Sequence, residues 1–360
     1  MLVGVILLVI LIFGLLVFVH EFGHFVAAKR AGVEVEEFGF GFPPRLLGVP
    51  YRGTLYSLNA IPLGGFVKMK GETLEDTTPG SFGATNFWQK TQILLAGVAM
   101  NILTAYILLV ILCATGLPPV IDGQYSFGAP SYSQPKAVMA VEVVSGSPAA
   151  AAGLQRGDLI THGNGQRLTS EDGLLTFTKA HAGQTITLEV SHRGTARTIH
   201  PQLRGPKATD GFLGVTPFQT YALRYSLPDA IVTAAGITLQ LMWATLGAFG
   251  GLIAGLFIHG KVSSDVTGPV GIVVLLKNII DLGIGYVLIF VASISISLGV
   301  INALPLPALD GGRWALALVQ RVTKRTLNSD IETWVHATGF AALILLMVVV
   351  TYFDIKRFGS

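Results

Sequence analysis

The sequence predicts an α-helical polytopic membrane protein with four transmembrane helices and one polar domain inserted between two membrane halves. Hydrophobic residues make up 51% of the 360 residues and charged residues only 12%, about half the charged fraction of an ordinary soluble domain. The net charge is only +3, and with no continuous basic patch we expect no nucleic-acid partner. The apolar stretches of bilayer-spanning length are Met1–Phe25, Ile93–Leu117, Ile284–Leu304 and Ala337–Phe353.

The first apolar stretch is predicted to remain in the protein as a membrane anchor. Met1 to Val19 contain no charged side chain, so the stretch lacks the basic start of a signal peptide and exceeds its usual apolar length. It also runs on into His20 without a small-residue cleavage site. The one cysteine, Cys113, cannot form an intrachain disulfide, and we expect it to pack within the second stretch.

Basic residues predict how these stretches are oriented, because cytoplasmic loops carry an excess of lysine and arginine. The first two stretches are separated by Lys29, Arg30, Arg45, Arg52, Lys68, Lys70 and Lys90, and the last two by Arg313, Arg321, Lys324 and Arg325. Both loops are therefore expected in the cytoplasm and both termini outside, although Lys356 and Arg357 oppose this assignment. The polar block from 122 to 226 is then extracytoplasmic.

A fifth stretch, Ala230–Ile258, is uncharged but contains five glycines. If it crossed the membrane, the basic segment 313–325 would be carried outside. We therefore expect it to lie along the outer leaflet or dip into it as an amphipathic or re-entrant element. A true fifth span is the alternative, since hydropathy alone allows it.

The block 122–226 shows the pattern of a small α+β domain. Ser147–Ile160 reads as a short helix followed by a Gly-Asp turn into a strand, and Asn164-Gly165 is typical of a tight hairpin. The other predicted elements are strands at Ala140–Val144, Gln184–Ser191 and Arg197–Leu203, and a helix at Ser170–Ala180.

This pattern resembles a permuted PDZ domain, in which Gly211–Val215 matches the carboxylate-binding loop. PDZ domains bind extended peptides by adding a strand to a sheet edge, so a peptide ligand or adaptor is an expected partner. The alternative is a spacer domain that binds nothing. The histidines of this block are scattered and predict no second metal site: His162, His181, His192 and His200.

The sequence His20-Glu21-Phe22-Gly23-His24 predicts a metal site inside the membrane. An H-E-x-x-H spacing places two imidazoles on one face of a helix, where they can share one zinc ion with the glutamate beside it. The motif follows a bilayer-length apolar run. An ionisable cluster at that depth is a functional site by default.

Asp310 is the predicted third metal ligand. A catalytic zinc takes three protein ligands plus water, and Asp310 ends the third span on the same side of the membrane as the two histidines. Pro305 and Pro307 cannot continue a regular helix, so they should end the span before the acid. Gly311 and Gly312 are expected to let the backbone turn around it.

With these motifs the chain resembles the site-2 protease family of intramembrane zinc metalloproteases, and within it the bacterial branch that includes the regulator of sigma-E protease. The matching segments are HEFGH, Gly39–Pro43, Leu63–Met69, the PDZ block, Gly268–Ile272 and N-x-x-P…LDGG. The resemblance implies that His20, His24 and Asp310 hold Zn²⁺ and that Glu21 is the catalytic acid/base. It places Asn302 and Pro305 near the substrate. Val98 replaces a proline of the family pattern, and the chain has room for one PDZ domain where better-known members have two.

The resemblance also implies a membrane-embedded β-hairpin whose edge pairs with an unwound substrate. Tyr56–Ala60 and Gly64–Met69 read as short strands around Ile61–Leu63. The substrate-binding residues expected there are Gly64, Gly65, Phe66 and Val67. A simple turn at Gly64-Gly65 is the alternative.

The predicted activity is therefore hydrolysis of peptide bonds within transmembrane segments, in a multi-pass protein of the bacterial inner membrane. Its expected partners are membrane lipid and single-pass, pre-trimmed transmembrane substrates, such as anti-sigma factors or signal-peptide remnants. A PDZ-bearing scaffold or chaperone with a non-catalytic metal site is the alternative function. A metal transporter would need polar residues along several spans.

The predicted domain boundaries follow from the same features. The N-terminal membrane half is 1–121, the PDZ domain 122–226, a membrane-peripheral or re-entrant linker 227–283, and the C-terminal membrane half 284–360.

Overall fold

The computed structural model describes residues 2–119, 121, 123–192, 194–208, 211–260, 267–324 and 328–358. The chain divides into two compact units. Unit 1 comprises Met1–Ile107, Thr238–Leu276 and Val291–Ser360, and unit 2 comprises Leu108–Ile237 and Lys277–Phe290. Each unit is described by itself.

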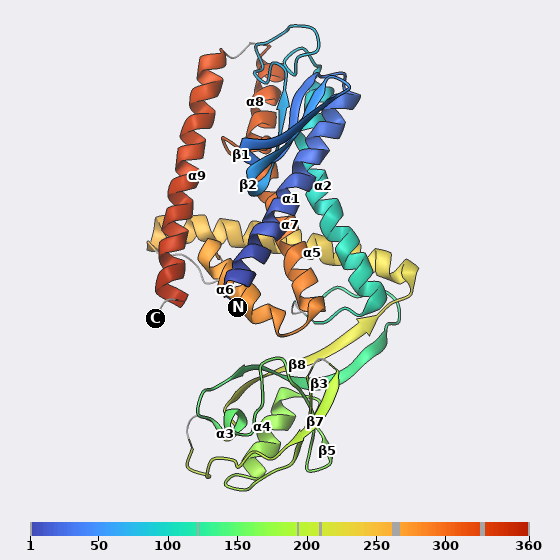
Figure 1. The fold of residues 1–360 in the computed structure, drawn as a ribbon, viewed down its shortest axis with the longest axis vertical. Coiled ribbons are helices and arrows are strands. Elements are labelled where there is room, and N and C mark those ends of the chain that lie inside the picture. Colours follow the sequence, from blue (N-terminus) through green and yellow to red (C-terminus); the bar gives the residue numbers. More distant parts are fainter. Residues whose placement is uncertain are drawn as a thin grey trace. The chain divides into compact units, whose positions relative to one another are not determined.

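Long apolar helices form most of unit 1 (Figure 1). The four predicted spans are all helical: α1 (Leu2–Arg30), α2 (Phe87–Thr115), α7 (Ile284–Ala303) and α9 (Ser329–Phe358). These helices and α5 (Leu227–Ala254) are the ones in the described chain that are long and apolar enough to cross a membrane. Two shorter helices are α6 (Pro269–Ile280) and α8 (Asp310–Thr323).

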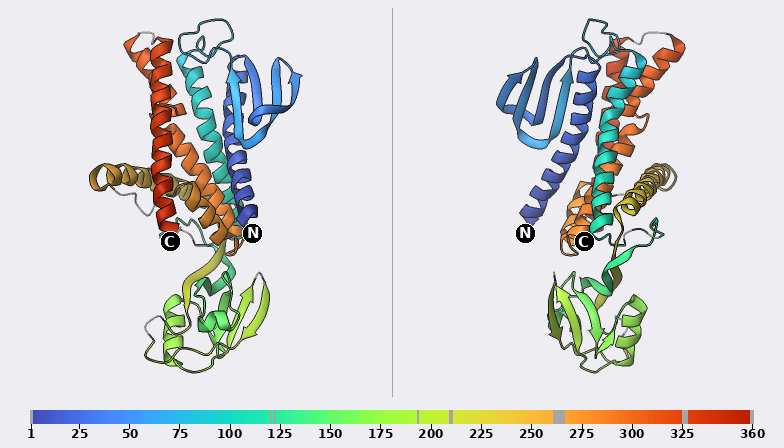
Figure 2. Two further views of the ribbon diagram at one scale, coloured as in Figure 1. Left: turned by 60° about the vertical axis from the view of Figure 1, so that its left-hand side comes forward. Right: turned by 90° about the vertical axis from the view of Figure 1, so that its right-hand side faces the viewer.

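The glycines of the fifth apolar stretch do not interrupt it. Helix α5 runs unbroken from Leu227 to Ala254 and continues as a π-helix, η1 (Gly255–His259), so the stretch is one continuous helix. At Gly247, Gly250 and Gly251 a methyl group would meet no neighbouring atom. These glycines therefore weaken helix propensity without breaking the helix. The part of α5 in unit 1 runs across the direction of α1 and α9 (Figures 1 and 2).

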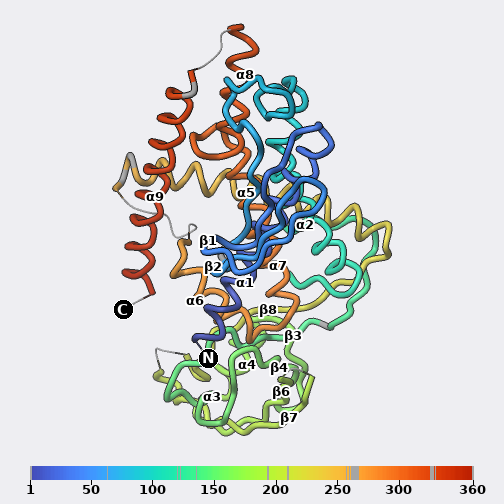
Figure 3. Tube along the Cα trace, turned by 45° about the horizontal axis from the view of Figure 1, so that its top comes forward, coloured from blue at the N-terminus to red at the C-terminus, as the bar shows by residue number. Residues whose placement is uncertain are grey.

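A small sheet lies against α1, as Figures 2 and 3 show. It contains β1 (Val35–Tyr51) and β2 (Thr54–Met69), joined by a turn at Arg52-Gly53 where both residues have positive φ. The two strands predicted around Ile61–Leu63 are therefore parts of one element, and their common partner β1 was not predicted. The turn of the hairpin is not at Ile61–Leu63.

The register shows that β1 and β2 each contain two segments, or legs, that pair separately. Residues 37–40 pair on one side with 65–68, and on the other side with 55–58 in a ladder whose residue numbers rise together. Residues 45–51 pair with 54–59 across the Arg52-Gly53 turn. In the described chain, the leg containing residues 65–69 pairs with β1 on one side only. This leg lies against α1, since a Cβ added at Gly65 would come 3.2 Å from Phe18.

Unit 2 contains a sheet of β3 (Ser131–Val143), β4 (Leu159–Gly163), β5 (Gln166–Arg167), β6 (Leu188–His192), β7 (Thr195–Ile199) and β8 (Val215–Arg224). The strand order is β7-β6-β4-β3-β8, with β5 paired to β4. Helices α3 (Pro148–Ala151) and α4 (Glu171–Ala180) pack with it around buried apolar side chains that include Val138, Ile160, Phe177 and Leu188.

Several local predictions for this block are confirmed. Ser170 caps α4 by accepting the N–H of Gly173, which explains why the helix begins where the sequence predicts. Asn164 and Gly165 both have positive φ and connect β4 to β5, the geometry that an Asn-Gly hairpin turn requires.

A buried carboxylate ties the loops of unit 2 together. Asp158 is fully buried, and its oxygens bind Arg197 Nη2 at 2.5 Å, His192 Nδ1 at 2.7 Å and the Gln155 N–H at 2.9 Å. Burying a carboxylate is unfavourable unless its oxygens are bonded. These three partners supply that compensation.

We predict that Asp158→Ala destabilises unit 2 locally. The substitution removes the acceptor that Arg197, His192 and the Gln155 N–H share, and each lost hydrogen bond to a charged group costs about 1.5–3 kcal/mol. Hydrogen exchange of the intact protein should show faster exchange in the peptides that cover β6 and β7. The exposed Glu142→Ala on β3 is the control and should leave exchange unchanged; equal protection in both variants would contradict the prediction.

Candidate metal and catalytic centre

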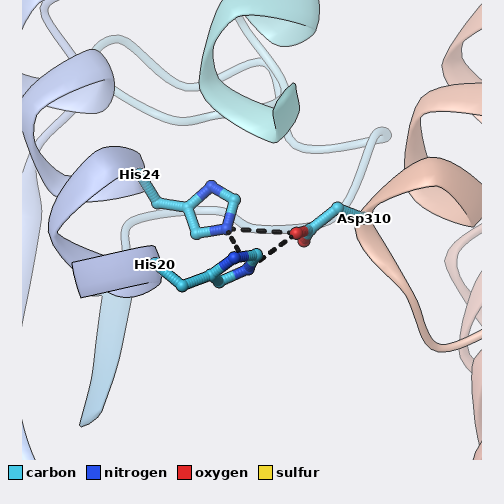
Figure 4. A group of neighbouring side chains, drawn as sticks. All are labelled: His20, His24 and Asp310. Carbon is cyan, nitrogen blue, oxygen red and sulfur yellow. Dashed lines mark hydrogen bonds and ion pairs between the residues drawn. The ribbon is translucent and has the colours of Figure 1, made fainter. Parts of the chain in front are cut away.

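Helix α1 brings His20 and His24 onto one face, as the H-E-x-x-H spacing predicts. The two Nε2 atoms lie 3.1 Å apart, and the rings are nearly perpendicular with centroids 4.8 Å apart. Both residues are buried, with 7% and 5% of their surface exposed. The two Nε2 atoms thus face one point inside unit 1 (Figure 4).

Asp310 completes the cluster. Its Oδ2 atom lies 2.9 Å from His20 Nε2 and 3.2 Å from His24 Nε2. Helix α7 ends at Ala303, before the two prolines as predicted, and Asp310 is the first residue of α8. A carboxylate in the first turn of a helix is stabilised by the unpaired N–H groups there.

The turn before Asp310 is made differently from the prediction. Gly311 and Gly312 lie inside α8, and the reason for glycine is space: an added Cβ would overlap the carbonyls of Ala303 and Leu306. The residue with the left-handed backbone is Ala308, with φ of 71°. The prolines and glycines therefore pack the loop tightly, while an alanine makes the turn.

Helix α2 holds the second nitrogen of each ring. His24 Nδ1 lies 2.7 Å from the carbonyl of Ile93, so this nitrogen carries the proton and donates it. His20 Nδ1 lies 3.2 Å from the amide of Asn101. At Gly97 a Cβ would lie only 2.5 Å from His24 Nε2, so α2 can approach the rings this closely only with glycine there.

The donor set fits zinc. Two imidazole nitrogens and a carboxylate oxygen are the ligands of many catalytic zinc sites, and ligands about 2.0–2.1 Å from zinc lie roughly 3.3 Å from one another in a tetrahedron. The separations of 2.9, 3.1 and 3.2 Å here are close to that value. Among the described residues, this is the group of His, Cys, Asp and Glu that could hold a metal ion.

Glu21 and Asn302 face the same cavity as the cluster. The cavity has a volume of about 210 Å³, and its lining comprises Val17, His20, Glu21, Asn101, Leu298, Asn302, Ala308, Leu309 and Asp310. The backbone of Val67 on β2 lies near the Glu21 carboxylate. An acid beside three metal-type ligands at a small cavity can exchange protons with a molecule held there.

The other predicted substrate residues are not among those that line this cavity. Pro305 is exposed in the loop between α7 and α8 and is not part of the lining. Gly64 and Gly65 lie against α1, where an added Cβ would come 2.7 Å from Val17 and 3.2 Å from Phe18. Phe66 follows them, and Val67 reaches Glu21.

Sequence reasoning missed Gly97 and Asn101 as members of the site. Their spacing of four residues places them on one face of α2, which is the signal that could have found them. That face meets Gly23 of α1, where a Cβ would lie 2.5 Å from the carbonyl of Ala96. A glycine on each of two apolar helices is typical of close helix packing.

Comparison with known proteins now identifies the family. The sequence model of peptidase family M50 matches residues 8–346, a range that holds both histidines, Glu21 and Asp310. The chain belongs to peptidase family M50.

This M50 peptidase is similar over nearly its whole length to known bacterial metalloproteases. It is 29% identical to the zinc metalloprotease RasP of Geobacillus kaustophilus, with 97% of each chain covered. It is 28% identical to the regulator of sigma-W protease RasP of Bacillus subtilis, with 99% of each chain covered. It is also 28% identical to the regulator of sigma-E protease RseP of Salmonella typhimurium, with 97% of each covered.

Family and relatives confirm the predicted activity. The M50 peptidase is an intramembrane zinc metalloprotease, and Zn²⁺ is its cofactor. Its long apolar helices and these relatives make it a protein of the bacterial inner membrane.

We predict that Gly97→Ala lowers zinc retention of the M50 peptidase. The new methyl group would displace the His24 ring, and disturbing the groups around metal ligands typically costs 10–100-fold in metal affinity. Zinc per protein should be measured by mass spectrometry after equilibration with a graded chelator. Gly4→Ala on α1 is the matched control, because a Cβ there meets no atom within 4 Å. Identical zinc retention in the two variants would show that α2 does not constrain the rings.

Proposed function

We propose that His20, His24 and Asp310 bind the catalytic zinc and that Glu21 is the general base and acid of peptide hydrolysis. The observation that carries the proposal is the cluster of His20, His24 and Asp310 from α1 and α8, beside a cavity that His20, Glu21 and Asp310 line. When bound, zinc would polarise the peptide carbonyl and lower the pKa of a water molecule.

Glu21 would take the proton of the attacking water and deliver it to the departing amine. Its position supports this role, because it neighbours His20 in sequence and lines the same cavity without being one of the three convergent ligands. Asn302 lines the same cavity and carries an amide N–H₂ group. We propose that it donates to the substrate carbonyl, where negative charge develops during attack.

Asn101 and Ile93 would orient the histidine ligands. A histidine that binds metal through Nε2 keeps its proton on Nδ1 and needs an acceptor for it. Ile93 supplies a carbonyl to His24. For His20 the acceptor would be Asn101 Oδ1, which has no partner among the described residues while Nδ2 faces the ring. Exchanging the two ends of this amide, which crystallography at ordinary resolution does not distinguish, satisfies the ring.

The leg of β2 from Gly64 to Val67 is proposed to hold the substrate backbone. In a transmembrane helix every peptide group is already hydrogen-bonded, so the cleaved segment must unwind and needs new partners in lipid. A strand edge supplies them. Two features support this leg: residues 65–69 pair with β1 on one side, and the backbone of Val67 lies near the Glu21 carboxylate.

For the membrane topology we propose four spans, α1, α2, α7 and α9, with α5 along the outer leaflet. The basic segments 29–90 and 313–325 then share the cytoplasm, and the metal centre lies near that side. The direction of the unit 1 part of α5, across α1 and α9, supports this arrangement (Figure 1). Residues 122–226 are proposed as the extracytoplasmic PDZ domain.

The PDZ groove is proposed to lie between β8 and α4, next to the loop Gly211–Val215. Strand addition along β8 is restricted, however. The outward N–H of Gln219 already donates to Glu171 Oε1 at 2.9 Å, and Pro217, which faces the same way, has no N–H. Ala140 on β3 pairs with Pro217, and the N–H of Ala140 donates to the Asp158 carbonyl on the side of β3 away from β8. The nitrogen of Pro217 therefore faces away from β3. A peptide would therefore bind mainly at the loop unless Glu171 moves.

The substrates are proposed to be single-pass membrane proteins that another protease has already shortened. Two relatives are named as regulators of sigma-W and sigma-E, which makes anti-sigma factors the first class to test. Signal-peptide remnants are the second class, since both present one apolar helix with a free end.

We predict that Glu21→Gln abolishes cleavage while zinc binding is retained. Loss of general acid–base catalysis costs about 10²–10⁴-fold in kcat, and glutamine keeps the shape of the side chain. Cleavage of a model single-pass substrate in detergent and zinc per protein should be measured on the same preparations. Glu36→Gln, an exposed acid on β1, is the control. Retained turnover by Glu21→Gln would refute the assignment, and loss of zinc would show that Glu21 acts as a ligand.

The topology can be tested by cysteine labelling in a Cys113→Ser background. Lys277→Cys, an exposed position at the end of α6, should react with a membrane-impermeant maleimide on intact spheroplasts. Lys324→Cys, exposed at the end of α8, should react only after the cells are opened. If Lys277→Cys also reacts only in opened cells, α5 is a true span and the four-span scheme is wrong.

A further inference from the structure

The loop that delivers Asp310 has an unusual backbone at Ala308. Among the described residues, the non-glycine residues with positive φ are Arg52, Asn164, Ala308 and Lys324. Arg52 and Asn164 lie in hairpin turns, and Lys324 follows the last residue of α8. Ala308 alone among them lines the catalytic cavity. Because an L-residue in the left-handed region is strained, the surrounding structure must hold Ala308 in place.

Helix α9 supplies the group that holds it. The N–H of Ala308 donates to His336 Nδ1 at 3.0 Å. One turn further along the same face of α9, an added Cβ at Gly339 would overlap Pro307. Helix α9 therefore approaches the 307–308 backbone to direct contact, and His336 makes the hydrogen bond at that contact.

Ala308 separates two cavities. On one side is the catalytic cavity with His20, Glu21 and Asp310. On the other is a cavity of about 430 Å³ lined by Glu72, Thr73, Ala308, Arg313, Glu332, Thr333, His336 and Phe340. His336 thus bonds the loop from the side opposite the metal cluster, and it lines no part of the catalytic cavity.

The chemistry of His336 indicates that its role is to accept this hydrogen bond from Ala308. Since Nδ1 accepts a hydrogen bond, the neutral ring carries its proton on Nε2. Nε2 is buried and has no hydrogen-bond partner in the described chain. Keeping an ionisable ring with one unsatisfied nitrogen in an apolar helix is unfavourable. The Ala308 bond is the interaction that offsets it.

We propose that His336 is a positioning residue for the metal centre, which holds Ala308 in its left-handed conformation and thereby fixes Asp310 two residues later. The proposal rests on the proposed role of Asp310 as a metal ligand. It assigns to the last helix, which contributes no ligand, a part in building the site.

The test compares variants at positions 336 and 308 of the full-length protein. His336→Leu removes the acceptor, whereas His336→Asn keeps a side-chain oxygen that can accept the same N–H. Ala308→Gly allows positive φ without strain. The probes are Zn²⁺ in competition with a chelator and the visible absorption spectrum of the Co²⁺-substituted protein, which reports ligand geometry. Thr338→Ala, an exposed residue that bonds only within α9, is the control.

We expect His336→Leu to lower zinc affinity by about 10–100-fold, the usual effect of losing a group that orients a ligand, and to alter the Co²⁺ spectrum. For a model substrate whose transmembrane segment lies between soluble domains, the kcat of His336→Leu should fall and its KM should stay unchanged. His336→Asn should restore most of the affinity. Adding Ala308→Gly to His336→Leu should restore part of it, because the bond is needed less when the turn is unstrained.

Unchanged zinc affinity and an unchanged Co²⁺ spectrum in His336→Leu would overturn the proposal. Equal losses in His336→Leu and His336→Asn, with no gain from Ala308→Gly, would also overturn it, because they would indicate a general packing role. If His336→Leu does not fold, the same measurements on His336→Asn and on the double variant His336→Asn/Ala308→Gly decide whether the proposal holds. Asp310→Asn tests the premise separately: if it leaves the Co²⁺ spectrum unchanged, the ligand assignment fails rather than the role of His336.

Discussion

Two imidazoles and a carboxylate meet within 3.2 Å inside an assembly of apolar helices, and much of unit 1 serves to make this meeting stable. The two Nε2 atoms lie 3.1 Å apart at this meeting point. Each ring is fixed by its other nitrogen, one on a carbonyl and one on an amide of α2. The metal and the helix contacts therefore depend on each other, since neither the rings nor the carboxylate would stay buried alone.

Close backbone contact is the means by which the helices reach the metal ligands. Gly23 and Gly97 bring α1 and α2 together, Gly299 brings α7 to α2, and Gly339 brings α9 to the loop before Asp310. In lipid, helices associate through such contacts because burial of apolar surface supplies no driving force there. The glycines that a hydropathy profile treats as neutral are thus the residues that determine where the ligands lie.

The amino-acid sequence predicted the meeting of His20, His24 and Asp310 better than it predicted the residues that support them. The spacing of His20 and His24 and the arrangement of the spans were enough to pair them with Asp310. Strand β1 was missed because the glycines and prolines of 35–51 hide any alternation of apolar and polar residues. Nothing about an alanine predicts the positive φ of Ala308. The sequence predicts a last span that begins at Ala337, because polar residues precede it, yet α9 begins at Ser329 and so contains His336. Contacts between distant segments set these features, and local patterns do not report them.

The edge of β8 has a consequence for the solution behaviour of unit 2. An open strand edge with free N–H groups is a template on which another chain can add, and sheet proteins that leave it open tend to associate edge to edge. On β8 the proline at 217 and the carboxylate of Glu171 on Gln219 close two successive outward positions. The same two features that restrict a peptide ligand therefore also disfavour edge-to-edge pairing of β8 between neighbouring copies on one membrane surface.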